Sequence, residues 1–148
     1  AVFDFKRRES HLASLVLAMN EALATGRDVL LFTQRINSQG GIGAGNPPVG
    51  RLLSQSLVEV VKKLSVPPSF LIAKGGATSS DVLTEGLGVS RAMVSGQLLP
   101  GAPVWRLGPE ALFPDLPYVV FPSNIGADDA LITAVERFKT MQAEIADN

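Results

Sequence analysis

The chain has 148 residues, of which 46% are hydrophobic and 18% are charged, and its formal net charge is −1 at pH 7. This length fits one compact domain, residues 1–148, and the composition argues against intrinsic disorder. The near-neutral charge predicts no general attraction to nucleic acid or to an anionic membrane. Cysteine is absent and His11 is the one histidine, so we expect no disulfide and no metal site.

The N-terminus carries no targeting signal that we can identify. Residues 1–9 have mixed charge without an apolar core, and no apolar run approaches the roughly 20 residues of a membrane span. We therefore expect a cytoplasmic protein. The chain starts with Ala1 and its mean hydropathy is positive, which favours a piece of a larger protein over a mature chain with a large core. Part of its apolar surface would then face a missing domain or another subunit of a homo-oligomer.

The first half of the chain predicts a helix, a strand, a loop and a second helix. Ser10 can cap the first helix, and Gly26 suits its end. The continuous apolar run 29–32 is typical of a strand covered on both faces. Residues 34–48 contain four glycines and two prolines and are predicted to form a loop. The apolar spacing over 53–64 predicts the second helix, which ends before Pro67 and Pro68.

The second half predicts three further strand regions and two helices. Strands are expected over 70–73 and 118–121, and residues 91–107 read as extended segments interrupted at 99–103. A short helix follows the first of these strands, and a final helix uses apolar residues from Leu131 to Met141. The alternation of strands and helices predicts an α/β fold: a three-layer α/β/α sandwich with a largely parallel, mixed sheet.

Familiar catalytic motifs do not match the chain. The glycine-rich segment 40–45 has the spacing of a phosphate-binding P-loop, but Asn46 and Pro47 replace its lysine and hydroxyl residue. Neither the G-x-G-x-x-G dinucleotide pattern nor a G-x-S-x-G serine elbow is present. The carboxylates Asp128 and Asp129 fit a helix start, where they more often complement the helix dipole than bind a metal.

Two predicted strands end in glycine-bearing turns that each precede a helix. The first turn follows Lys74 and reads Gly75-Gly76-Ala77-Thr78, and the second is Ser123-Asn124-Ile125-Gly126. A helix N-terminus presents unpaired N–H donors, and glycine lets an anion approach the backbone. Each turn alone could be a tight connection without a ligand. As a pair at the carboxyl edge of one sheet, they predict a phosphate cradle.

Three segments in order carry a resemblance to a known family. Residues 74–79, 96–105 and 121–126 resemble the C-terminal nucleotide-binding domain of the four-carbon acid sugar kinase family. The resemblance implies the ATP-binding half of a kinase for a threonate-like or erythronate-like acid. It also implies a missing N-terminal domain that holds the acid. The residues of the motifs most resemble those of family members that are part of longer fused chains.

The resemblance also implies which residues bind the nucleotide. Gly75, Gly76, Ala77 and Thr78 match the loop that contacts phosphates, and Gly126, with Ser123 and Asn124, matches the second nucleotide-contacting turn. Magnesium would arrive with ATP. Many relatives carry an acidic residue where this chain has Ala77, which puts its handling of magnesium in doubt. The catalytic residues stay unknown and are expected on the missing domain.

Other readings remain open at this stage. Lys74 could neutralise phosphate charge, but an exposed lysine at a strand end is the more ordinary interpretation. Arg35 and the segment 40–45 could close over a nucleotide or belong to a linker. The main functional alternative is a stand-alone anion- or nucleotide-binding regulatory module without catalysis. Another is an isomerase or transferase for a phosphorylated sugar.

Overall fold

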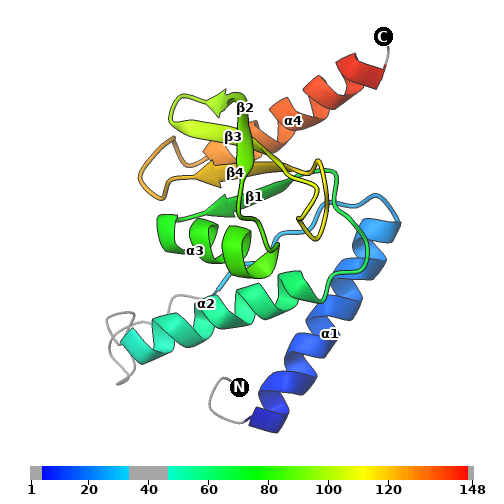
Figure 1. Cartoon of the computed structure of the whole chain (residues 1–148), viewed down its shortest axis with the longest axis vertical. Helices are drawn as coiled ribbons and strands as arrows, with labels where there is room; N and C mark the ends of the chain where they lie inside the picture. The colour runs from blue at the N-terminus through cyan, green and yellow to red at the C-terminus, as the bar shows by residue number, and fades with distance from the viewer. Residues whose placement is uncertain (1–4, 34–46, 147–148) are drawn as a thin grey trace. The chain divides into compact units, whose positions relative to one another are not determined.

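The computed structural model describes residues 5–33 and 47–146, which belong to two compact units. The first unit comprises Ala1–Pro68 with Asp81–Leu87, and the second comprises Ser69–Ser80 with Gly88–Asn148. Figure 1 labels most of the helices and strands of both units. Among the helices of residues 5–33 and 47–146, none has both the length and the apolarity that crossing a bilayer requires.

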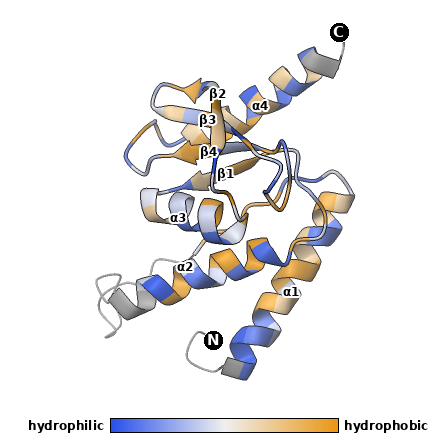
Figure 2. Ribbon diagram, in the orientation of Figure 1, coloured by the Kyte–Doolittle hydropathy of each residue, from blue (hydrophilic) through white to orange (hydrophobic). Residues whose placement is uncertain are grey.

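The first unit is helical. It contains α1 (Phe5–Ala24), α2 (Pro47–Lys62) and the short π-helix η2 (Val82–Gly86). Apolar and polar residues alternate along α1 and α2 (Figure 2), as expected for helices that bury one face. The buried face includes Leu12 of α1 and Val58, Val60 and Val61 of α2.

Polar contacts fix how α1 meets α2 and the residues after it. The Arg8 guanidinium forms an ion pair with Glu59 at 2.7 Å. At the other end of α1, the Asn20 Oδ1 atom accepts hydrogen bonds from the backbone N–H groups of Ser65 and Val66 at 3.0 and 3.1 Å. These two N–H groups lie just past the end of α2, where the helix offers them no carbonyl acceptor. Asn20 supplies the acceptor instead.

The predicted strand over 29–32 is wrong. The run has no strand conformation, and Leu30 and Phe32 are 69% and 75% exposed. Val29 and Leu31 are half-buried and line a hollow of about 270 Å³ against α1. The residues have strand composition, but within the described ranges no neighbouring strand pairs with them, and a strand requires such a partner.

The start of the second helix also differs from expectation. It begins at Pro47, so the last two residues of the loop predicted over 34–48 belong to the helix. Proline is tolerated in the first turn of a helix because its missing N–H would have no partner there. The remainder of the predicted loop, residues 34–46, lies outside the described residues.

The second unit is built on a mixed sheet, which confirms the α/β class, but the sheet is not largely parallel as predicted. The strand order is β1-β4-β3-β2; β1 and β4 are parallel, and the other two neighbouring pairs are antiparallel. The extended segments predicted within 91–107 form the hairpin β2–β3. The strands are β1 (Leu71–Lys74), β2 (Ala92–Leu99), β3 (Ala102–Leu107) and β4 (Pro117–Phe121).

Helices lie on both faces of this sheet, as the three-layer prediction requires. They are α3 (Gly76–Asp81) and α4 (Ala130–Ala146). Successive side chains of β4 point to opposite faces. The buried Tyr118 hydroxyl donates a hydrogen bond to the carbonyl oxygen of Ser79 in α3, at 2.8 Å. The next residue, Val119, belongs to the apolar cluster that α4 covers.

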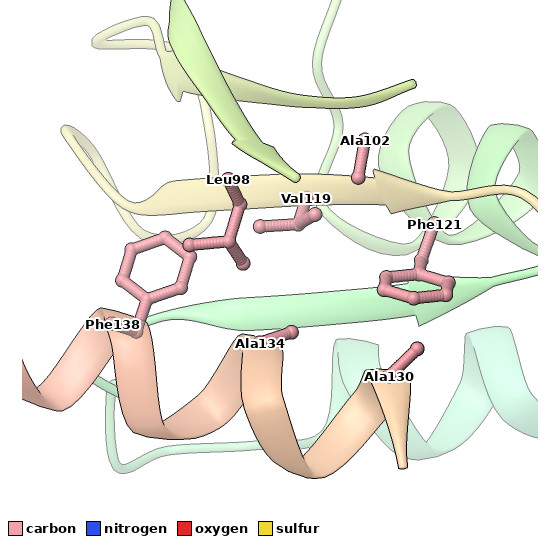
Figure 3. Close-up of a cluster of buried hydrophobic side chains, with 7 residues drawn as sticks. All are labelled: Leu98, Ala102, Val119, Phe121, Ala130, Ala134 and Phe138. Carbon is pink, nitrogen blue, oxygen red and sulfur yellow. The ribbon is translucent and has the colours of Figure 1, made fainter. Parts of the chain in front are cut away.

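The cluster between the sheet and α4 forms the core of this unit. Figure 3 shows the side chains of α4 directed toward those of the strands. The small Ala130 and Ala134 allow the helix to approach the sheet closely, and the Phe138 ring stacks on Phe70 at a centroid distance of 4.7 Å. The cluster comprises Leu98, Ala102, Val119, Phe121, Ala130, Ala134 and Phe138.

The burial of Tyr118 gives a testable pH dependence. The side chain has no exposed surface, and burial raises its pKa above the usual value of 10.0. Above about pH 10 the unfolded chain loses this proton while the folded chain keeps it, so stability is complete below that pH and falls as the pH rises. Each pH unit in that range should cost about 1.4 kcal/mol.

Tyrosinate absorbance measures this directly because Tyr118 is the single tyrosine of the chain. We expect the absorbance to rise near pH 10 in urea, and in native buffer only when the fold is lost. The variant Tyr118→Phe should show no such signal. A native titration near pH 10 would contradict the burial of the hydroxyl.

Candidate functional site

The carboxyl ends of β1 and β4 meet at one edge of the sheet. The two strands run parallel, and Lys74, the last residue of β1, pairs in register with Phe121, the last residue of β4. The turns that follow therefore start side by side. The structure brings the two glycine turns to one sheet edge, where open α/β sheets bind their ligands.

The first turn is held by Gly75. Its N–H donates to the carbonyl oxygen of Phe121 at 2.9 Å, and its φ of +100° is a conformation that residues with side chains rarely adopt. The expectation that the Gly75 amide faces a phosphate is therefore wrong, because the amide is committed to the neighbouring strand. Its carbonyl accepts the first helical hydrogen bond, from the Ser79 amide.

Three backbone donors remain at this turn. The N–H groups of Gly76, Ala77 and Thr78 form the first turn of α3, where a helix has no carbonyl to accept them. Gly76 and Ala77 are exposed and Thr78 is half-buried. A side chain added at Gly76 would meet nothing within 4 Å, so the space next to this backbone is open.

The hydroxyl groups after the turn have different roles. Ser79 is buried, and its Oγ donates to the carbonyl oxygen of Ala73 at 2.8 Å. The Ser79 hydroxyl is therefore not available to a phosphate, because it ties α3 to the end of β1. The Thr78 hydroxyl lies near Gly75: its Oγ1 atom is 4.0 Å from the position that a Cβ atom at Gly75 would occupy.

Lys74 links the two turns. Its ammonium donates to the carbonyl oxygen of Ser123 at 3.2 Å and lies 5.3 Å from the centre of the Phe121 ring. Lys74 is exposed at the end of β1, as its ordinary interpretation expects, and its ammonium also contacts the neighbouring turn. Among the described residues of this edge, Lys74 is the one cation, and the backbone of the second turn holds its ammonium beside the first turn. No sequence pattern signalled this, because the contact depends on the β1–β4 register.

The second turn has its left-handed residue at Gly126 and not at Asn124. Ser123 and Asn124 are exposed, and Asn124 does not adopt the left-handed backbone that its residue type tolerates. That conformation belongs to Gly126, with φ of +84°. A Cβ atom at Gly126 would collide with the Cβ of Ala130, so glycine is needed here both for backbone geometry and for space.

The remaining candidates are distributed away from these turns. His11 is an exposed residue of α1. Arg35 and the segment 40–45 lie outside the described residues. Within residues 5–33 and 47–146, no three histidine or carboxylate side chains are grouped as metal ligands. Asp129 lies at the start of α4, where its carbonyl accepts the first helical hydrogen bond, from the Thr133 amide.

This edge of the sheet thus offers the backbone donors of residues 76–78, the Thr78 hydroxyl and the Lys74 ammonium. The second turn lies beside them, and its Gly126 has no room for a side chain. These groups suit the oxygens of an anion. The fold places the protein in the class of α/β domains, which bind their ligands at the carboxyl ends of parallel strands.

Comparison with known proteins identifies the family. The family model described as the nucleotide-binding C-terminal domain matches residues 1–131. The chain belongs to this family. No curated protein sequence matches the chain.

Two crystal structures of a protein from Bordetella bronchiseptica are similar to the chain. Both contain a domain of unknown function (DUF1537) with bound citrate, and both are domain-swapped dimers. In one, the identity is 25% over 79% of this chain, with a TM-score of 0.55; in the other, it is 22% over 84%, with a TM-score of 0.56. This chain spans 28% and 30% of the lengths of those chains, less than a third of each.

The two glycines predict opposite responses to alanine. Gly126→Ala introduces a strained φ and a collision with Ala130, which together should cost about 2–4 kcal/mol of unfolding free energy. Gly76→Ala meets open space in a helical turn and should be neutral or stabilising by up to about 1 kcal/mol. Urea denaturation of both variants measures the difference. Equal stability of the two would contradict the described second turn.

Proposed function

We propose that this chain is the ATP-binding half of a kinase that phosphorylates a four-carbon sugar acid of the threonate or erythronate type. The observation that carries the proposal is the pair of glycine turns at the joined ends of β1 and β4. Membership of the nucleotide-binding family supports the nucleotide. The acid substrate rests on the resemblance of the three sequence segments and on no contact in the structure.

In this proposal the first turn binds the phosphates of ATP. The N–H groups of Gly76, Ala77 and Thr78 would donate to phosphate oxygens, and the open space beside Gly76 fits a close approach. The Thr78 hydroxyl would add a donor. Lys74 would balance negative charge from its position between the turns. Gly75 acts by shaping the turn, since its own N–H is used by β4.

Phosphoryl transfer depends mainly on positioning and on stabilising charge. ATP would supply the phosphoryl group, and magnesium would arrive with its phosphates. Ser123, Asn124 and Gly126 would contact the same nucleotide from the second turn. Ala77 offers no carboxylate near the phosphates, so this turn would organise the metal less strongly than the acidic relatives do.

The acid and the catalytic base are proposed to lie outside these residues. The chain spans less than a third of the similar Bordetella proteins, which leaves room for an N-terminal acid-binding domain. On this proposal the 148-residue chain binds ATP weakly and transfers no phosphate by itself. The cytoplasmic location expected from the sequence stays a prediction.

The variant Gly76→Asp tests the phosphate site. A carboxylate at this exposed position should weaken ATP binding by at least about tenfold, because it places negative charge where phosphate would lie. The fold should survive, since no atom lies within 4 Å of the added Cβ position. Isothermal titration calorimetry with magnesium and ATP measures the binding.

Two further variants control this experiment. Gly76→Ala adds a side chain without charge and should bind ATP nearly as the parent does. Ala143→Asp adds the same charge at an exposed position late in α4 and should have no effect. If Gly76→Asp binds ATP as tightly as the parent, the phosphate site is not at this turn.

We further propose that the exposed run 29–32 is covered by a second copy of the chain. Leu30 and Phe32 are 69% and 75% exposed, and apolar side chains next to each other on a surface favour association. The similar Bordetella structures are domain-swapped dimers, which supports a homodimer here.

Light scattering after size exclusion tests this association. The double variant Leu30→Glu/Phe32→Glu should shift a dimeric parent to a monomer, because two buried carboxylates would oppose the contact. Ile132→Glu, at a 63% exposed position of α4, should remain dimeric. A monomeric parent, or a dimer unaffected by the double variant, would exclude this surface.

A further inference from the structure

A hollow lies beside the second glycine turn. Its volume is about 360 Å³, at the lower end of the roughly 300–1,000 Å³ of small-molecule sites, so it suits one ring system rather than a whole nucleotide. Three segments form its walls: the β2–β3 turn, the turn after β4 and the start of α4. Its lining includes Leu99, Pro100, Ile125, Ala127, Asp129 and Thr133.

The apolar wall of the hollow is held by the core. Leu99 and Ile125 both pack against the buried cluster under α4. The hairpin turn approaches the second glycine turn closely: a Cβ atom at Gly101 would lie 3.7 Å from the Ile125 Cδ1 atom. Two of the three sequence segments that carry the family resemblance therefore share this hollow. Its shape is set by packing before any ligand arrives.

The two turns differ in charge. The first turn has the backbone donors of α3, and the Lys74 ammonium lies between the two turns, bonded to the Ser123 carbonyl. The start of α4 instead carries the exposed carboxylates of Asp128 and Asp129, and Asp129 lines the hollow. A triphosphate would be attracted to the first turn and repelled from these carboxylates. The hollow is therefore suited to the uncharged end of a nucleotide.

We propose that this hollow binds the adenine ring of ATP, while the phosphates lie at the first turn. The inference rests on the nucleotide-binding function proposed above and reassigns the second turn from phosphate to base. Leu99, Pro100 and Ile125 supply apolar contact for the ring. The Asp129 carboxylate is an acceptor for the exocyclic amine, and the Thr133 hydroxyl can donate to a ring nitrogen.

These polar groups favour adenine over guanine. Adenine presents an amine where guanine presents a carbonyl oxygen. In the same orientation of the ring, the Asp129 carboxylate would repel this oxygen, and guanine would have to turn its N1–H and N2 amine toward the carboxylate to bind. The parent chain should accordingly bind ATP more tightly than GTP, and Asp129 should carry much of the preference.

Filling the hollow tests the assignment. Ala127 is exposed and lines the hollow, so Ala127→Leu narrows it without burying new surface. With magnesium present, calorimetry should show ATP binding weakened by at least about tenfold, while binding of inorganic tripolyphosphate stays within about twofold. Ala143→Leu, an equal enlargement elsewhere on α4, should change neither ligand. Circular dichroism checks that each variant folds.

A second variant probes the polar group without changing shape. Asn caps a helix as well as Asp does, so Asp129→Asn should leave α4 intact. Its amide can donate as well as accept, so the ratio of ATP to GTP affinity should fall by at least about fivefold.

The outcomes separate the two proposals. If the parent binds neither ATP nor tripolyphosphate, the nucleotide function fails and the adenine site fails with it. If the parent binds ATP but Ala127→Leu and Asp129→Asn do so unchanged, only the adenine site is overturned. If Ala127→Leu weakens ATP and tripolyphosphate equally, the hollow holds phosphate and the assignment of the base is wrong.

Discussion

The parallel pairing of β1 with β4 is the constraint on which the candidate site depends. It aligns Lys74 with Phe121, so the chain leaves both strands at the same edge and in the same direction. A shift of one residue in this register would turn every side chain of one strand to the other face. The Gly75 amide and the Lys74 ammonium would then lose their carbonyl partners on β4 and on the turn after it. The proximity of the two turns is thus a property of the sheet rather than of either loop.

Two buried hydrogen bonds fix the position of α3, and neither of them uses the exposed N–H groups of its first turn. Ser79 donates to Ala73 within the same strand–helix connection, and Tyr118 reaches the Ser79 carbonyl from β4. Both hydrogen bonds are buried, where leaving a partner unmatched is costly. They hold a helix of six residues that would be unstable by itself. The exposed donors of its first turn can therefore keep one arrangement without a ligand to order them.

Local patterns predicted most of the second unit. The strands 70–73 and 118–121, the hairpin and the last helix follow from apolar spacing and from turn residues. The glycine turns were predicted at the ends of the correct strands, but the positive φ of Gly75 and Gly126 was not predicted. What failed depended on partners distant in sequence. The run 29–32 has the composition of a strand and no described strand beside it. The carbonyl that the Lys74 ammonium contacts could not be predicted either, because it depends on the β1–β4 register.

The π-helix η2 carries a consequence for how the family tolerates changes in chain length. Its closing hydrogen bond runs from the Leu87 amide to the Val82 carbonyl, five residues apart, where an α-helix would span four. One extra residue is accommodated in this turn while Val82, Leu83 and Leu87 all stay buried. Gly86 makes room for the extra residue beside Val61, because a Cβ atom at Gly86 would lie 3.4 Å from the Val61 Cγ1 atom. A single-codon deletion here would convert the turn to ordinary α-helix. Natural variants that differ by one residue between α3 and β2 would be accommodated at this point, leaving the sheet edge unchanged.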